Sequence, residues 1–216
     1  MAEHIANEIH KSWAIENINL DTFAIRSIIV NSLNINIPEW KLNDEEKYKR
    51  EQAAVKATLF LLNSKEKFSF ELVCQTHKLL KNYSEDINWV SIRKNEIHIV
   101  RQNEDTDDIQ IDYIGPPAKD IPKLINEFSK WWYDSRNILL RPIGAALAHL
   151  YFVVIHPFEN GNGRIARMLA DKYMIDESNL YTAYRPYSIS SEIYKNLNRY
   201  YDIINDFSQN KIIFPT

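Results

Sequence analysis

Residues 156–167 (HPFENGNGRIAR) bring together the side chains best suited to phosphate chemistry in this chain. A histidine such as His156 titrates near neutral pH and can act as a general base. Arg164 and Arg167 are three residues apart, so a helix would carry both on one face, where their forked donors suit phosphate oxygens. The segment therefore predicts a phosphate-binding site beside a proton acceptor.

A turn of small residues separates the histidine from the arginines. Gly161, Asn162 and Gly163 lead into a predicted helix, and the free N–H groups at a helix N-terminus attract anions. The Asn162 side chain can also donate to a phosphate oxygen. The chain has only 4 glycines, so two in one turn indicate a requirement of that turn. A helix–turn–helix connection whose glycines serve only geometry is the alternative, and it leaves the histidine and arginines unexplained.

The elements that must position these residues show mainly helical periodicity. We expect helices over residues 3–16, from Asp21 to about 33, from Asn43 or Asp44 to about 62, from Ser69 to about 80, from Asp120 to about 132, from Pro142 to 155, and over 163–175 and 191–207. Pro157 disfavours helical geometry at the preceding residue, so one helix should end at His156 and present the imidazole in a loop. Residues 88–114 alternate apolar and polar side chains around an acidic tip, 103–108, which predicts a β-hairpin.

Composition limits the class of protein. The 216 residues are 45% hydrophobic and 25% charged, which is typical of one globular domain with or without a small appendage. A net charge of −3 gives no basic field for nucleic acid, and no apolar run is long enough for a membrane. The single cysteine excludes an internal disulfide, and no leader is recognised, so we expect a cytoplasmic protein. The lack of βαβ alternation argues against a Rossmann domain or a P-loop NTPase.

The segment 156–167 resembles the signature of the Fic (Fido) family, H-x-F-x-[Asp/Glu]-G-N-G-R-x-x-R. The matching positions are His156, Phe158, Gly161, Asn162, Gly163, Arg164 and Arg167. The helix order, the hairpin before the motif and the Arg199-Tyr200-Tyr201 stretch also look Fic-like. The resemblance implies a mainly α fold, a Fic-type helical bundle with one β-hairpin flap (88–114) before the motif helix pair. It further implies an N-terminal segment, 1–40, followed by a Fic core, 41–216.

The resemblance implies a protein adenylyltransferase, with ATP as the substrate. His156 would remove a proton from a Ser, Thr or Tyr hydroxyl of a target protein. The hydroxyl oxygen would then attack the α-phosphorus, so that AMP stays on the target and pyrophosphate leaves. The implied roles are an anion nest at Gly161, Asn162 and Gly163, leaving-phosphate neutralisation by Arg164, terminal-phosphate binding by Arg167, loop anchoring by Phe158, and nucleotide-pocket contacts by Tyr200 and Tyr201. The spacing of the two tyrosines fits core packing equally well.

Asn160 departs from the family pattern, which usually has an acid there. The acid normally holds Mg²⁺ between the nucleotide phosphates, so the resemblance implies Mg²⁺ or Mn²⁺. An asparagine carbonyl can ligate a metal but carries no charge. The neighbouring Glu159 could replace it only if both side chains point the same way. A slow enzyme, a different metal preference or a nucleotide-binding module without catalysis are the alternatives that this position leaves open.

A second motif, Ser12-Trp13-Ala14-Ile15-Glu16-Asn17, resembles the inhibitory [Ser/Thr]-x-x-x-Glu-[Gly/Asn] sequence of Fic proteins. Ser12 and Glu16 are four residues apart, which places them on one face of the helix expected over 3–16. The resemblance implies that Glu16 pairs with Arg167 and keeps it from the γ-phosphate. A polar helix end capped by Asn17 is the alternative.

The target protein is not specified by the sequence. A target segment could add a strand to the edge of the hairpin, 92–113, with its hydroxyl in register with His156. Ordinary edge packing explains the hairpin equally well. Removal of AMP, with Glu16 positioning water, and transfer of another phosphate-containing group are related alternatives. A homodimer through helix faces that the core leaves unused is compatible with this interpretation, and we interpret His77 and His149 as structural.

Overall fold

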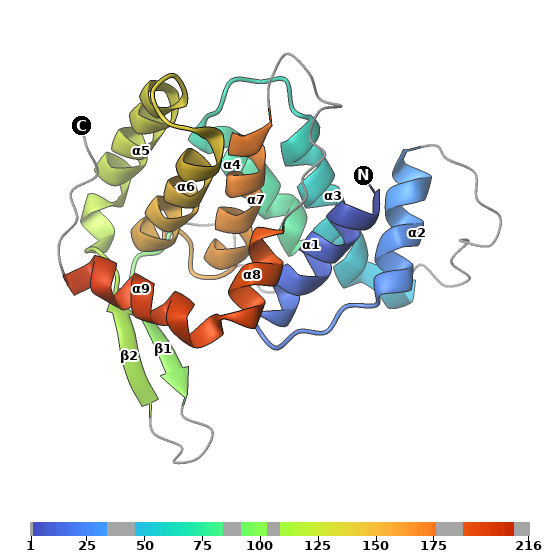
Figure 1. The fold of residues 1–216 in the computed structure, drawn as a ribbon, viewed down its shortest axis with the longest axis horizontal. Coiled ribbons are helices and arrows are strands. Elements are labelled where there is room, and N and C mark those ends of the chain that lie inside the picture. The colour runs from blue at the N-terminus through green and yellow to red at the C-terminus, as the bar shows by residue number, and fades with distance from the viewer. Residues whose placement is uncertain (1, 34–45, 84–91, 103–108, 176–187, 210–216) are drawn as a thin grey trace.

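The protein is a bundle of helices with one hairpin, and its computed structural model describes residues 2–33, 46–83, 92–102, 109–175 and 188–209 (Figure 1). The helices of this described part are α1 (Ala2–Ala14), α2 (Thr22–Ser32), α3 (Lys49–Asn63), α4 (Phe70–Lys81), α5 (Ile121–Arg136), α6 (Arg141–Ile155), α7 (Asn162–Met174), α8 (Ile189–Lys195) and α9 (Leu197–Gln209). Short 3₁₀ turns cover Glu46–Tyr48 and Ala118–Asp120. The predicted fold class, mainly α with one β-hairpin, is confirmed. Among the helices described, none has the length and apolar character needed to cross a membrane.

Several helix starts follow the predicted caps. The side chains of Asp21 and Ser69 each accept a hydrogen bond from a backbone N–H of the following turn, as expected for N-caps. Pro142 lies in the first turn of α6, where its missing N–H costs nothing. The start predicted at Asn43 or Asp44 lies outside the described residues. These local rules succeed because a cap depends only on residues next to it in the chain.

Two predicted helices differ from the structure. The helix expected over 3–16 ends at Ala14, and a turn follows in which Asn17 adopts a left-handed conformation with φ 58°. The helix expected over 191–207 is two helices, α8 and α9, interrupted at Asn196 (φ −125°, ψ 42°). Apolar spacing misses such breaks because the pieces on either side keep an inward face.

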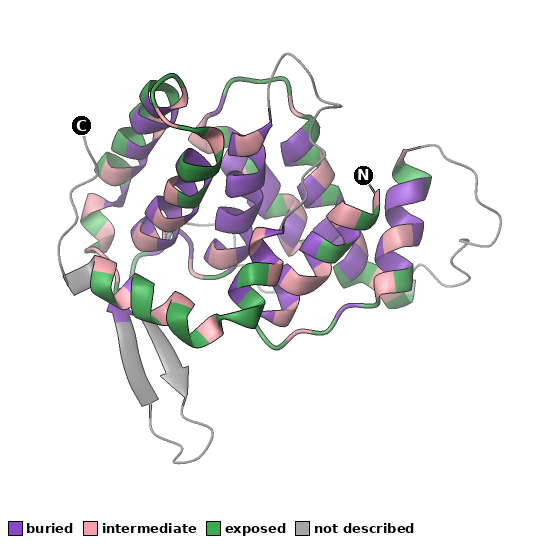
Figure 2. Ribbon diagram, viewed as in Figure 1, coloured by how far each residue is buried: buried purple, intermediate pink, exposed green. Residues whose placement is uncertain are grey.

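The central pair of the bundle is α6 and α7. Helix α5 packs against α6, while α3 and α4 pack against α7 (Figure 1). Gly144 permits the close approach of the pair, because a Cβ there would lie 2.2 Å from the Tyr173 ring. Most of α7 is buried, as its colour in Figure 2 shows. The helix that begins at the glycine turn therefore carries its arginines into the interior.

The hairpin consists of β1 (His98–Gln102) and β2 (Ile109–Ile114), which pair antiparallel with a register shift between Ile99 and Val100. This confirms the strands predicted within 88–114, whereas the predicted tip, 103–108, lies outside the described residues. The Tyr113 hydroxyl donates to the Val154 carbonyl, and α9 packs against β2. The hairpin is thus attached to the last turn of α6, directly before His156.

A buried carboxylate fixes α1 to the start of α8. Glu8 is only 5% exposed, and it accepts hydrogen bonds from the hydroxyls of Ser188 and Ser190. Its carboxylate also accepts the backbone N–H of Ser190 at 3.0 Å. A buried charge requires such partners. The N-terminal helix is therefore docked on the core by a specific polar contact as well as by apolar packing.

We predict that Glu8→Ala lowers the free energy of unfolding by about 3 kcal/mol, because two hydroxyls and one N–H lose their acceptor. Urea denaturation followed by circular dichroism measures the loss. Glu3→Ala is the matched control on the same helix, since Glu3 forms an exposed pair with Arg26 and its loss should cost less than about 1 kcal/mol. Equal losses in the two variants would show that Glu8 is not a special contact.

Candidate active site

Helix α6 ends at His156, which adopts a left-handed conformation with φ 49° and ψ 59°. Its backbone N–H still bonds to the Phe152 carbonyl at 3.0 Å. The helix therefore stops where Pro157 predicted that it would. A residue with a Cβ pays about 1–2 kcal/mol for this conformation, so surrounding contacts must hold it.

The imidazole of His156 is held in one tautomer. Nδ1 lies 3.0 Å from the Val153 carbonyl, and because a carbonyl can only accept, Nδ1 carries the hydrogen. The lone pair that can accept a proton is therefore on Nε2. The pKa of His156 is lowered to about 4, chiefly by burial and also by the charge of Arg93, while the Val153 bond and Glu16 oppose the lowering. At pH 7 the ring is neutral, as a general base must be.

Asn162 closes the loop that follows the histidine. Its Oδ1 accepts the Phe158 N–H at 3.0 Å, and its Nδ2 donates to the Phe158 carbonyl at 2.7 Å. The residue is 1% exposed, so both bonds are shielded from water. Gly161 begins α7 with φ 79°, a conformation that favours glycine. In this conformation the Asn162 amide supports the loop, and its contact with a phosphate oxygen stays a prediction.

The side chain of Phe158 anchors the loop in the hydrophobic core. Its ring is fully buried and stacks on the His77 ring with centroids 3.9 Å apart and planes 9° apart. His77 Nε2 in turn lies 2.8 Å from the Asn160 carbonyl, to which it donates. Burial lowers the pKa of His77 to about 4, which keeps the ring neutral. His77 thus has a structural role, as expected, and it contacts the loop that carries the candidate site.

The carboxylate of Glu16 bridges both arginines of the motif. Its Oε2 lies 2.9 Å from Arg164 Nε, and its Oε1 lies 2.9 Å from Arg167 Nη2. Each arginine side chain is only 2% exposed, whereas that of Glu16 is 30% exposed. The sequence pointed to the pair with Arg167 alone. Among these three groups, two positive charges face one negative charge.

The rest of the N-terminal motif surrounds the same two arginines. Ser12 Oγ accepts from Arg167 Nε at 2.7 Å, and the Ser12 carbonyl accepts from Arg167 Nη2 at 2.8 Å. The Trp13 ring centroid lies 4.4 Å from Arg164 Cζ, a cation–π contact that the motif did not reveal. Glu16 reaches the site from the turn after α1, where Asn17 supplies the left-handed residue.

Gly163 leaves room for this arrangement. A Cβ on Gly163 would lie 3.0 Å from Arg167 Nη1 and 3.5 Å from Glu16 Oε1. A longer side chain at this position would collide with the guanidinium or displace it. The turn therefore needs a small residue at position 163, next to the ion pair, as well as a glycine at position 161, where the backbone is left-handed.

Tyr200 and Tyr201 lie on α9, both half-buried, with ring centroids 5.4 Å apart. The Tyr200 hydroxyl and His149 Nε2 are 3.1 Å apart. Burial, and then the charge of Arg167, lower the pKa of His149 to about 3. Burial raises the pKa of Tyr200, and Arg167 opposes the rise. His149 and Tyr200 thus pack against each other near Arg167. The contact of Tyr200 and Tyr201 with a nucleotide base stays a prediction.

The surroundings of Asn160 do not fit a divalent cation held by the protein. Asn160 Oδ1 accepts the Gly161 N–H at 2.8 Å and lies 3.4 Å from Arg164 Nη2. Glu159 Oε1 instead accepts the backbone N–H of Lys94 at 3.2 Å. Across the described ranges, no three His, Cys, Asp or Glu side chains converge as a metal site. In this arrangement Asn160 is engaged within the loop, and its role as a metal ligand stays a prediction.

Two contacts of the site come from residues that no sequence pattern indicated. The Tyr83 hydroxyl accepts from Arg164 Nη1 at 3.2 Å. Arg93 is 1% exposed and donates from Nε to the His156 carbonyl at 2.6 Å. Both residues are far from the motif in sequence, and neither belongs to one of the two motifs. Only the folded chain brings them to the loop.

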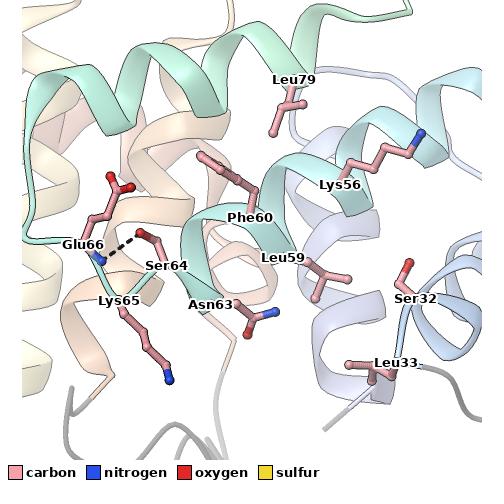
Figure 3. A pocket seen from close by; sticks show the side chains of 10 residues that line it. All are labelled: Ser32, Leu33, Lys56, Leu59, Phe60, Asn63, Ser64, Lys65, Glu66 and Leu79. Carbon is pink, nitrogen blue, oxygen red and sulfur yellow. Dashed lines mark hydrogen bonds between the residues drawn. The ribbon is translucent and has the colours of Figure 1, made fainter.

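A separate hollow of about 810 Å³ opens between α2, α3 and α4 (Figure 3). Leu59, Phe60 and Leu79 give it an apolar part, and Lys56 and Lys65 are among its polar residues. It contains none of the residues of the loop 156–167 or of the motif 12–17. The hollow and the candidate active site are therefore distinct features.

Comparison with known proteins agrees with this geometry. The sequence profile of the Fic/DOC family matches residues 67–174, half of the chain. A protein adenylyltransferase Fic from Nematostella vectensis is 40% identical over 65 residues, and one from Aedes aegypti is 23% identical over 145 residues. These alignments cover 30% and 67% of this chain but only 15% and 25% of the relatives. The chain thus aligns with a quarter or less of these curated relatives.

Solved structures show the same fold. A Fic family protein from Desulfovibrio desulfuricans superposes with a TM-score of 0.70 at 20% identity, over 96% of this chain and 58% of that one. Fic-1 from C. elegans superposes with a TM-score of 0.64 at 20% identity, over 93% of this chain and 55% of that one. At such low identity the superpositions establish the fold alone, and the chemistry has to be argued from the residues of the site.

We predict that Asn162→Ala lowers the free energy of unfolding by about 3 kcal/mol, because a buried N–H and a buried carbonyl of Phe158 lose their partners. Chemical denaturation measures this, and faster hydrogen exchange of the Phe158 amide would locate the loss. Asn198→Ala, on the exposed side of α9, is the control and should change stability by no more than about 0.5 kcal/mol. Equal stability of the two variants would contradict a stabilising role for the two hydrogen bonds between Asn162 and Phe158.

Stability should fall as the pH drops below about 6.5. The pKa values of His77, His149 and His156 are lowered from 6.5 to about 4, 3 and 4, so the unfolded chain takes up these protons first. The loss is absent above pH 6.5 and grows toward pH 4, by up to about 1.4 kcal/mol per pH unit for each histidine. Urea midpoints measured between pH 7.5 and 5 test this. His77→Gln should flatten the slope, and an unchanged slope would contradict the assignment.

Proposed function

The chain belongs to the Fic/DOC family, and on this basis we propose that it is a protein adenylyltransferase that moves AMP from ATP to a Ser, Thr or Tyr hydroxyl of a target protein and is inhibited by its own Glu16. One observation carries the proposal: the Glu16 carboxylate bridges Arg164 and Arg167 at 2.9 Å each. Two relatives of the chain are named protein adenylyltransferase Fic, which supports the same reaction.

The nucleotide phosphates would take the place of the Glu16 carboxylate. Buried guanidiniums need an anionic partner, and phosphate oxygens match their forked donors as well as a carboxylate does. Since one carboxylate faces two guanidiniums, a polyphosphate balances the charge more completely. The first N–H groups of α7 lie in the same turn and add donors for an anion. Arg167 would hold the terminal phosphate and Arg164 the leaving phosphates.

In the proposed reaction, Nε2 of His156 accepts the proton of the target hydroxyl. The hydroxyl oxygen forms a bond to the α-phosphorus, and the bond from that phosphorus to the pyrophosphate oxygen breaks. Pyrophosphate leaves with the bonding electron pair, and the histidine keeps the proton until solvent removes it. Arg164, nearly free of solvent, stabilises the negative charge that develops on the leaving group.

Inhibition follows from where α1 is fixed. Glu16 holds the arginines while Glu8 holds α1 to the start of α8, so the inhibitory turn stays in place without a ligand. Ser12 and Trp13 add contacts to Arg167 and Arg164. ATP can bind productively only when Glu16 no longer contacts Arg164 and Arg167. The proposed inhibition therefore acts by competition for two side chains.

The hairpin supplies the proposed docking edge for the target. Ile92 bridges antiparallel to Phe158, so the chain leading into β1 is already paired with the catalytic loop. A target segment that adds a strand to the hairpin, 92–113, would enter next to that loop. Its hydroxyl could then reach His156 in a register set by backbone hydrogen bonds.

A catalytically weakened nucleotide-binding module is the second candidate, and Asn160 favours it. The neutral amide provides no charge for a metal ion at the position where the family usually has an acid. Such a module would bind ATP at Arg164 and Arg167 but would transfer nothing. Binding and transfer must therefore be measured separately.

We predict that Glu16→Gly raises AMP transfer by about 10- to 100-fold, since two charge-assisted contacts that compete with the nucleotide are lost. Intact-mass spectrometry after incubation with ATP, and labelled ATP with a cell lysate as a source of targets, measure the product as one added AMP. The double variant Glu16→Gly, His156→Ala should lose the activity while still binding ATP.

Glu3→Gly is the matched control, because it changes an exposed glutamate of the same helix and should leave transfer at the wild-type rate. Equal activity of Glu16→Gly and wild type, with ATP bound to both, would contradict the inhibition. ATP binding without any AMP on the chain or on a lysate protein would instead support the nucleotide-binding module.

A further inference from the structure

The buried guanidinium of Arg93 lies at the C-terminal end of α6. Its Nε donates to the His156 carbonyl at 2.6 Å, and its Nη2 lies 3.5 Å from the Ile155 carbonyl. The last carbonyls of a helix lack intrahelical partners and carry partial negative charge, so a cation is favoured there. Arg93 therefore caps the helix that ends at the candidate general base.

The same side chain joins both stems of the hairpin. Nη1 donates to the Asn95 carbonyl at 2.8 Å, before β1, and Nη2 donates to the Pro116 carbonyl at 2.6 Å, after β2. The backbone N–H of Arg93 donates to the Pro157 carbonyl at 2.9 Å. One residue thus connects the end of α6, the catalytic loop and the two ends of the hairpin.

The backbone of His156 needs such external support. It is one of two non-glycine residues with positive φ in the described chain. The carbonyl of this strained residue is the one that accepts the Nε–H of Arg93. A charge-assisted bond is stronger than a neutral one, so it can hold an otherwise unfavourable peptide orientation. The direction of the imidazole follows from that peptide and from the bond between Nδ1 and Val153.

We propose that Arg93 is the positioning residue of His156, holding its imidazole in the observed orientation and tying that orientation to the hairpin on which a target would dock. The role rests on the proposed function, in which His156 is the general base. Arg93 acts through the His156 carbonyl and belongs to neither of the sequence motifs. A shift of the hairpin would be transmitted to the His156 carbonyl through this guanidinium, beside the Tyr113–Val154 bond and the Ile92–Phe158 pairing that also join the hairpin to this region.

The charges around His156 make the role measurable. Arg93 faces it from the segment before β1, and Glu16 faces it from the turn after α1. The arginines of α7, Arg164 and Arg167, contact Glu16. Burial is the main cause of the low pKa of His156, and Arg93 adds to it. Loss of the Arg93 charge, and any loosening of the ring toward solvent, should both raise this pKa.

Titration of His156 by NMR in the full chain tests the proposal without relying on activity. The resonance is assigned by its loss in His156→Ala. In Arg93→Met the pKa should move up toward the ordinary 6.5, and in Arg93→Lys, which keeps the charge but loses the forked contacts, it should move less. Arg136→Met is the matched control, because Arg136 also donates to a backbone carbonyl, that of Ile175. Arg136 lies at the end of α5, near the start of α6 and away from His156, so this change should leave the His156 pKa as it is.

Kinetics in the Glu16→Gly background supply the second readout. Arg93→Met should lower kcat by at least about tenfold, a part of the roughly 10²–10⁴-fold attributed to a general base, with KM for ATP unchanged. An unchanged His156 pKa in the folded Arg93 variants, or a higher KM with unchanged kcat, would overturn the proposal. If Arg93→Met does not fold, Arg93→Lys carries the test. If no AMP is transferred at all, the proposed function fails while the titration still decides the role of Arg93.

Discussion

Two guanidinium groups buried on α7 are the constraint on which the rest of the site depends. A charge shielded from water is tolerated only with an opposite charge and hydrogen bonds around it. Glu16 supplies the opposite charge to both Arg164 and Arg167 and a hydrogen bond to Arg167, with Ser12, Trp13 and Tyr83 completing the surroundings. Any anion that replaces the carboxylate must satisfy the same donors, so the proposed inhibition and the proposed phosphate binding would use one set of side chains.

The loop between α6 and α7 is held by residues from several parts of the chain. Asn162 clamps Phe158 from within the loop, and His77 stacks on the same ring while it donates to the Asn160 carbonyl. Arg93 holds the His156 carbonyl from the hairpin. A left-handed histidine would relax without these contacts. The catalytic geometry is thus a property of the packed interior and not of the loop alone.

The N-terminal helix combines a structural role with the proposed inhibitory one. Glu8 binds the start of α8, one turn later Ser12 binds Arg167, and Glu16 follows in the closing turn. These positions are four residues apart, so α1 and its turn present them along one side. Buried apolar side chains such as Ile9 and Trp13 also dock α1, but the contacts of Ser12 and Glu16 with the arginines are polar and can be displaced by competing charges. Its attachment therefore suits reversible inhibition better than a purely apolar interface would.

Neighbours along the chain were enough to predict the helical class, the caps at Asp21 and Ser69, the helix end at His156 and the glycine turn that begins α7, because each of these depends on local residues. It also pointed to Glu16 as a partner of Arg167. The packing of the helices was needed to show that Glu16 bridges Arg164 as well, that Asn196 interrupts the last helical segment, and that Arg93, Tyr83 and His77 contact the site and its loop. Such contacts join residues far apart in the chain, and their formation depends on how the helices pack, which no local pattern encodes.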